Sequence, residues 1–176
     1  MTPYVMAALL LMAAPPIMPA APNALARTAL DVPIIAQEPE RCGQAALEMV
    51  LRYYGADGAA LDEATSAYDP VLRGSLITDL AAAARRAGYL AIVATLSPDS
   101  LTALLSAGVP PIVLYQSGLA PLTVAHFAVV TGWDPEGDTF TINDGRARPR
   151  KIGRVDLAKR WRTAGSRALI IRRPTP

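Results

Sequence analysis

The chain contains one cysteine, Cys42, and one histidine, His126, and these two residue types can act together on a carbonyl group. A thiol attacks a carbonyl carbon as its thiolate, while an adjacent imidazole takes the proton and later returns it to a leaving group. Cys42 opens a segment with helical periodicity, where unpaired N–H groups and the positive end of the helix dipole lower the pKa of a thiol. The sequence therefore predicts that Cys42 is a nucleophile and His126 its general base.

Two further residues have the positions that such chemistry needs. Asp144 lies at the end of the strand predicted after the one that carries His126, and an antiparallel hairpin would set the two side by side. A carboxylate there would orient the imidazole. A developing oxyanion needs hydrogen-bond donors, and the main-chain N–H of Cys42 and the side-chain amide of Gln37 are the candidates.

The elements that must position these residues are helical in the first half of the chain. An extended arm, "LDVPIIAQ", leads to "GQAALEMVLRYYG", whose apolar residues recur at the three-and-four spacing of a helix that ends at Gly55. We expect two more helices in "ALDEATSAY" and "SLITDLAAAARRAG", the second capped by Ser75 or Thr78. A strand, "YLAIVATL", and a capped helix, "SPDSLTALLSAG", follow.

The second half of the chain has the alternating and β-branched pattern of strands. We expect these strands in "PPIVLYQ", "AHFAVVTGWD", "DTFTIND" and "RALIIRR", separated by turns such as "DPEGD". The basic run "RARPRK" is predicted to be a solvated loop. A helical half with the nucleophile at a helix start, followed by an antiparallel sheet, predicts an α+β fold.

Length and composition exclude several classes of protein. The 176 residues, 52% of them hydrophobic, suffice for one domain and are too few for two ordinary ones. The net charge of +2 is small and the arginines are spread, which argues against nucleic acid as a partner. One cysteine and one histidine cannot fill a structural zinc site, and no glycine-rich phosphate loop is present, so we expect no metal and no bound cofactor.

The first 26 residues have the pattern of a secretory signal peptide. No charged residue precedes Arg27, and the apolar run "VMAALLLMAA" is followed by "PPIMP" and a small-residue cleavage site ending at Ala26. The run is too short and too interrupted by proline for a stable membrane span. The usual positive charge before the run is missing, so an upstream start or an uncleaved membrane anchor stays open. We expect residues 1–26 to be a signal peptide or anchor, residues 27–176 to be the domain, and the product to be periplasmic or extracellular if the segment is cleaved.

The order Gln37, Cys42, His126, Asp144 resembles the papain-like cysteine peptidases, most closely peptidase family thirty-nine, the bacteriocin-processing or double-glycine peptidases. The stretches "VPIIAQEPERCGQAALEMVLRYYG", "AHFAVVTGWD" and "TFTIND" carry the resemblance, which covers nearly all of the chain from Leu30 onward. It implies a papain-like fold, a Cys-His-Asp triad with a glutamine as oxyanion donor, and a peptide or protein substrate, often cut after Gly-Gly in a leader. Many relatives are fused to a transporter with an ATPase. The resemblance thus implies a stand-alone member served by a separate export system.

One position departs from the family pattern and leaves an alternative open. Family members commonly have proline after the aspartate, whereas Gly145 follows Asp144 and Asn143 precedes it. Because asparagine orients the histidine in related peptidases, Asn143 could be the third catalytic residue, and strand alternation lets only one of the two face His126. Two other functions also stay open, a Cys-dependent amidase or transferase on other amides and a non-catalytic peptide-binding domain of the same fold.

Overall fold

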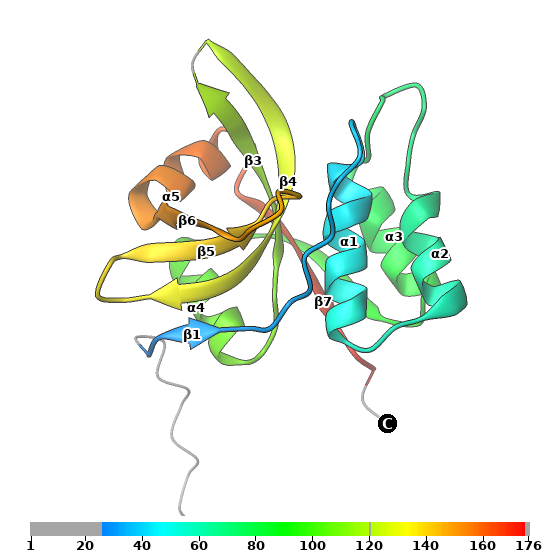
Figure 1. Ribbon diagram of the computed structural model, residues 1–176, viewed down its shortest axis with the longest axis horizontal. Helices are drawn as coiled ribbons and strands as arrows, with labels where there is room; N and C mark the ends of the chain where they lie inside the picture. The colour runs from blue at the N-terminus through cyan, green and yellow to red at the C-terminus, as the bar shows by residue number, and fades with distance from the viewer. Residues whose placement is uncertain (1–25, 120, 175–176) are drawn as a thin grey trace, which may run out of the picture.

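The computed structural model describes residues 26–119 and 121–174, so the apolar run of the expected signal peptide lies outside the described residues. Within the described part, five helices and seven strands form a layered α+β domain (Figure 1). This architecture confirms the predicted fold class, with a helical group that carries Cys42 beside an antiparallel sheet that carries His126.

The sheet has the strand order β2-β7-β3-β4-β5-β6, and the short β1 pairs with β4. Every strand pairing is antiparallel. The long β4 lies between β3 and β5, so it is held along much of its length on both sides. The strands are β1 (Thr28–Ala29), β2 (Leu90–Thr95), β3 (Ile112–Leu119), β4 (Leu122–Asp134), β5 (Thr139–Asn143), β6 (Arg150–Gly153) and β7 (Arg167–Arg172).

Helices cover both faces of the sheet, as Figure 1 shows, and each face has its own apolar core. On one face, α1 contacts β4 while α3 contacts β2 and β7; on the other, α4 contacts β4 and α5 contacts β3. The helices are α1 (Cys42–Tyr53), α2 (Gly58–Ser66), α3 (Ile77–Arg86), α4 (Pro98–Ser106) and α5 (Arg154–Arg162).

The apolar face of α1 fixes the position of Cys42. Leu47, Val50 and Leu51 are fully buried in the same core as Phe127 and Val129 of β4. Burying one such side chain contributes about 1.5–3 kcal/mol, so α1 is held firmly against the strand that carries the histidine. The first residue of the helix is thereby placed beside β4.

The predicted start of α3 was wrong in detail. The helix begins at Ile77, and the residue before it, Leu76, offers no side-chain cap. Neither Ser75 nor Thr78 takes the capping role, because the chain enters the helix from a loop in which the main chain of Leu76 accepts the first hydrogen bonds.

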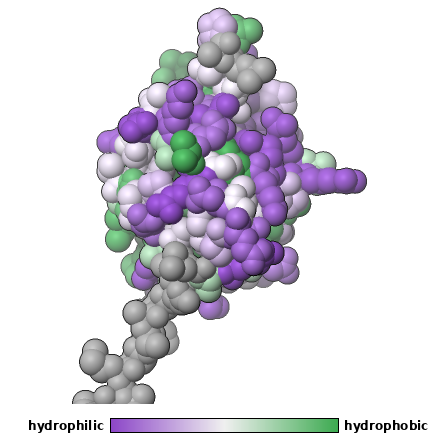
Figure 2. Space-filling model, turned by 90° about the vertical axis from the view of Figure 1, so that its left-hand side faces the viewer, coloured by the Kyte–Doolittle hydropathy of each residue, from purple (hydrophilic) through white to green (hydrophobic). Residues whose placement is uncertain are grey.

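The sequence interpretation also missed α5 and β6. The run "RARPRK" is not a loop throughout, since Arg150 begins β6 and pairs with Ile142 of β5. In α5 the buried side chains are Leu157 and Trp161, too few to give a clear apolar period. Figure 2 shows this side of the molecule, where hydrophilic side chains surround small apolar patches.

Candidate active site

The three elements that carry the predicted chemistry meet in one groove. Gln37 from the arm, Cys42 from the start of α1 and His126 from β4 all line this groove, whose volume is about 620 Å³. Residues 72–76 of the loop between α2 and α3 form one wall, and the β3–β4 hairpin forms another. The groove therefore brings together residues more than 80 positions apart in the sequence.

The surroundings of the Cys42 thiol favour its ionised form. Burial raises its pKa, but the hydrogen bond with His126, the main-chain N–H of Phe127, the charge of His126 and the N–H of Gly43 together lower the pKa below its ordinary value. Cys42 is the first residue of α1, and no side chain caps this helix start, so the positive end of the helix dipole also lies at the thiol. Cys42 is half-buried and reachable from the groove.

His126 shifts in the complementary direction. Burial lowers the pKa of its imidazole, but the hydrogen bond with Cys42, the main-chain contact with Asp144 and the charges of both residues raise the pKa overall. A lowered thiol pKa and a raised imidazole pKa are what a thiolate–imidazolium pair requires. The pair is thus poised to exchange a proton.

The imidazole is oriented by a main-chain group. Nε2 of His126 donates to the carbonyl oxygen of Asp144 at 2.9 Å, which leaves Nδ1 as the nitrogen available to Cys42. Oδ2 of the Asp144 carboxylate is engaged by arginines, accepting from Nε of Arg150 at 3.2 Å and lying 3.4 Å from Nε of Arg146, while Oδ1 is buried without a hydrogen-bond partner. The structure therefore brings Asp144 to His126, but through its backbone, whereas the sequence interpretation assigned the contact to the carboxylate.

Asn143, the alternative third residue, points elsewhere. It lies opposite Val129 in the β4–β5 register, and its Nδ2 donates to the carbonyl of Val32 at 3.2 Å. Its side chain is buried and ties β5 to the arm. In the described contacts Asn143 does not meet His126, so its position suits a structural link between the arm and the sheet.

Gln37 and Gly145 explain the departure from the family pattern. The N–H of Gln37 donates to the carbonyl of Gly145 at 3.2 Å, and its side chain lies against the glycine. A Cβ on Gly145 would fall 2.6 Å from Cγ and Cδ of Gln37, and the glycine has φ +79°. Proline, with φ near −65°, cannot adopt this conformation. The glycine at position 145 is thus what allows the Gln37 side chain to pack against the loop after β5, which contacts His126 through Asp144.

The sequence interpretation missed Tyr115, which contacts His126, and Arg150, which contacts Tyr115. Tyr115 lies opposite His126 in the β3–β4 register, with its ring edge-on to the imidazole at a centroid distance of 6.0 Å. Its hydroxyl accepts from Arg150 at 3.0 Å. A tyrosine in an apolar strand and an arginine in a basic run carry no sequence signal for such a contact.

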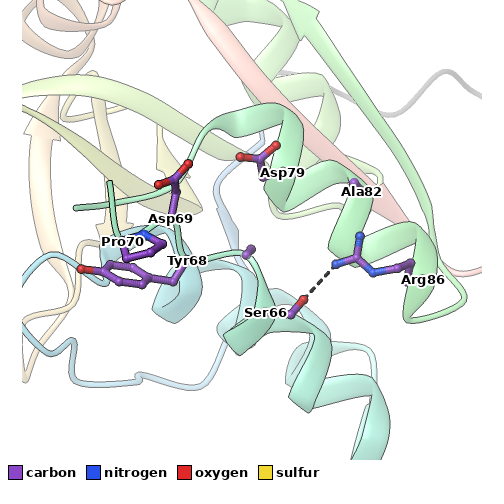
Figure 3. A pocket seen from close by; sticks show the side chains of 8 residues that line it. Ser66, Tyr68, Asp69, Pro70, Asp79, Ala82 and Arg86 are labelled. Carbon is purple, nitrogen blue, oxygen red and sulfur yellow. Dashed lines mark hydrogen bonds between the residues drawn. The ribbon is translucent and has the colours of Figure 1, made fainter. Parts of the chain in front are cut away.

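A separate pocket lies between α3 and the loop after α2 (Figure 3). Arg86 reaches across it to Ser66 at 2.8 Å and pairs with Glu63. Asp69 accepts two main-chain N–H groups of its own loop. These polar groups pair with one another or with the main chain of the loop, so the packing of the loop explains this pocket.

In the described ranges, no three histidine, cysteine or acidic side chains converge as metal ligands. None of the helices there combines the length and hydropathy needed to cross a bilayer.

The domain has the papain-like fold of cysteine peptidases. The chain belongs to the Peptidase_C39 like family, whose profile matches residues 29–169, and this confirms the resemblance drawn from the sequence. No match was found among curated protein sequences.

Solved structures share the same fold. A double glycine motif protease from an AMS/PCAT transporter, crystallised with the leader peptide, is 25% identical with a TM-score of 0.65 over 84% of this chain and 95% of that one. A C39-like protein from Bacillus anthracis is 20% identical with a TM-score of 0.70, over 86% and 100% of the two chains. The peptidase domain of Streptococcus ComA is 18% identical with a TM-score of 0.64, over 80% and 98%.

The paired pKa shifts predict the pH dependence of Cys42 alkylation. Because the thiol pKa is lowered, iodoacetamide should react rapidly well below pH ~8.5, the usual value for a free thiol. Replacing His126 by alanine removes the main partner that stabilises the Cys42 thiolate. The acid limb, the part of the pH–rate curve where alkylation speeds up as the thiol ionises, should then have its midpoint at higher pH. Mass spectrometry of the single labelled thiol measures both curves. Identical slow profiles with an ordinary midpoint would show that the pair does not form.

Proposed function

We propose that this protein is a cysteine peptidase that cleaves peptide bonds through the Cys42 thiolate and the His126 imidazole. The observation that carries the proposal is that Cys42, at the start of α1, and His126, oriented by the Asp144 carbonyl, line one groove, where each favours the charged form of the other. A structural cysteine buried in apolar surroundings would have a raised pKa instead. Membership of a peptidase-like family supports the same reaction class.

In the proposed mechanism, the Cys42 thiolate attacks the carbonyl carbon of the scissile peptide bond. His126 protonates the leaving amine, and an acyl-enzyme forms. The imidazole then takes a proton from water, which attacks the thioester and releases the acid product. Throughout, the Asp144 carbonyl holds the Nε2–H of His126, so Nδ1 keeps its direction toward the sulfur.

The oxyanion of each tetrahedral intermediate would lie between the Cys42 main-chain N–H and the Gln37 amide. Gln37 lines the groove beside the nucleophile, and its amide oxygen is buried without a partner against Gly145. That packing fixes the side chain before substrate arrives, and preorganised donors stabilise developing charge most effectively.

The walls of the groove suit a peptide with apolar side chains around the cut. Leu72 and Leu76 of the α2–α3 loop and Val124 of the hairpin line it with 54%, 50% and 65% of their surface exposed. Exposed apolar side chains around a nucleophile favour an apolar ligand. By analogy with the double glycine motif protease bound to its leader peptide, we propose cleavage after Gly-Gly in the leader of an exported peptide such as a bacteriocin.

Peptide turnover tests the mechanism. We expect wild-type protein to cut Gly-Gly leader peptides, and Cys42→Ala to cut none because no nucleophile remains. Gln37→Ala should lower kcat by about 10²–10³, the usual loss for one oxyanion donor. Gln116→Ala, which removes an amide outside this groove, is the matched control and should retain full kcat. Product formation is followed by mass spectrometry.

Different results would select the rival functions. Full activity in Cys42→Ala would contradict the mechanism. Turnover of peptidoglycan-derived amides in place of leader peptides would identify an amidase or transferase. A leader peptide bound tightly by wild-type protein and released intact would identify a binding domain.

We also propose that residues 1–26 direct export and are removed. The domain is held from Arg27 onward, since its guanidinium lies 2.9 Å from both Asp134 and Glu136 at the β4–β5 turn. Cleavage after Ala26 would remove one exposed hydrogen bond, from the Thr28 hydroxyl to the Ala26 carbonyl at 3.3 Å, and would keep both ion pairs of Arg27. Intact-mass analysis of the product from a bacterial host should find Arg27 as the first residue; a retained N-terminus in a membrane fraction would indicate an anchor instead.

A further inference from the structure

One arginine contacts both residues that lie against the His126 imidazole. Nε of Arg150 donates to the Asp144 carboxylate at 3.2 Å, and its terminal nitrogen donates to the Tyr115 hydroxyl at 3.0 Å. Asp144 in turn meets His126 through its carbonyl, and Tyr115 meets it through its ring edge. One guanidinium thus links the two neighbours of the imidazole.

Arg150 is the better placed of the two cations at Asp144. The Asp144 side chain is 1% exposed, and that of Arg150 is 34% exposed, whereas Arg146 is 68% exposed and more distant. Burial lowers the pKa of Arg150, but Tyr115 and Asp144 raise it overall. A buried carboxylate that loses its main partner is left as an uncompensated charge, whereas an exposed ion pair contributes little.

The anchored carboxylate also controls the carbonyl of the same residue. Asp144 is the first residue after β5, and beyond it the main chain is held at Gly145, whose carbonyl accepts from the Gln37 N–H at 3.2 Å, so β5 itself does not fix the Asp144 carbonyl. With the side chain fixed by Arg150, the peptide unit that faces His126 has a defined direction. Without Arg150, only the end of β5 and the contact between Gly145 and Gln37 would set the direction of that carbonyl.

We propose that Arg150 is a positioning residue, which keeps the Asp144 carbonyl on His126 and thereby maintains the reactive state of Cys42. Arg150 touches neither the nucleophile nor the base, and acts through Asp144 and Tyr115. This inference rests on the proposed function of the same site.

The test compares Arg150→Met with Arg148→Met by the pH dependence of Cys42 alkylation. Arg148 is an exposed residue of the same basic run, with no ion pair among the described residues, and serves as the matched control. We expect Arg150→Met to move the acid limb to higher pH and to slow alkylation at pH 6 by roughly 10- to 100-fold, the effect of misplacing a reacting group by about 1 Å. Arg148→Met should retain the wild-type profile. Coincident profiles for all three proteins would overturn the proposal.

A double-mutant cycle with Asp144→Asn separates positioning from a general loss of structure. If Arg150 acts through the Asp144 carboxylate, Arg150→Met should slow Cys42 alkylation by a much smaller factor in the Asp144→Asn background than in wild type. Equal costs in both backgrounds would overturn the proposal. Thermal unfolding of each variant shows whether the fold is retained.

Two milder variants keep the proposal testable if Arg150→Met does not fold. Tyr115→Phe removes one hydroxyl, and Arg150→Lys keeps the charge but lacks the fork that reaches both partners. Each should shift the acid limb in the same direction by a smaller amount; an unshifted limb in both would reject the role. Alkylation needs no substrate, so an uncut leader peptide would reject the peptidase proposal while the test of Arg150 still stands.

Discussion

Burial alone would keep the Cys42 thiol protonated, and the adjacent imidazole of His126 reverses that effect. The rest of the site follows from this requirement. The imidazole must stay charged although it is itself half-buried, so it needs an acceptor on its other nitrogen, and the Asp144 carbonyl supplies one. The helix start adds the N–H of Gly43, and β4 adds the N–H of Phe127, both directed to the sulfur. Main-chain groups of α1 and β4 therefore stabilise the nucleophile, and a main-chain group of the loop after β5 stabilises the base.

The architecture holds these elements at fixed separation. Fully buried side chains of α1 pack on β4, while β3 and β5 flank β4 on its two edges. The arm before α1 is tied to the end of β5 by Asn143, and its Gln37 packs on Gly145. Helix, strand and arm thus converge at the groove because three separate contacts limit their movement. Arg150 extends this bracing from β6 to the loop that faces the imidazole.

Much of this arrangement could be predicted from the sequence, and the missing parts share a physical cause. The spacing of apolar residues in α1 and the alternation in β4 and β5 are local signals, so these elements followed from them. The convergence of Cys42, His126 and Asp144 was predicted from the chemistry of these residue types and from the resemblance to peptidase family thirty-nine. A main-chain carbonyl is common to every residue, so no residue type could reveal that Asp144 meets His126 through its backbone. The role of Arg150 depends on the pairing of β6 with β5. Helix α5 is held by only two buried side chains in an otherwise charged segment. Both depend on tertiary contacts that leave no periodic pattern.

The charge state of His126 tests the central claim most directly, because the single histidine gives an unobstructed NMR signal. In wild-type protein, ¹⁵N-resolved titration should give an imidazole pKa above the usual value of about 6.5, with Nε2 carrying the proton in the neutral form. In Cys42→Ser the neutral hydroxyl cannot pair with an imidazolium, so the pKa of His126 should fall. Equal, unshifted pKa values in the two proteins would contradict the existence of a thiolate–imidazolium pair.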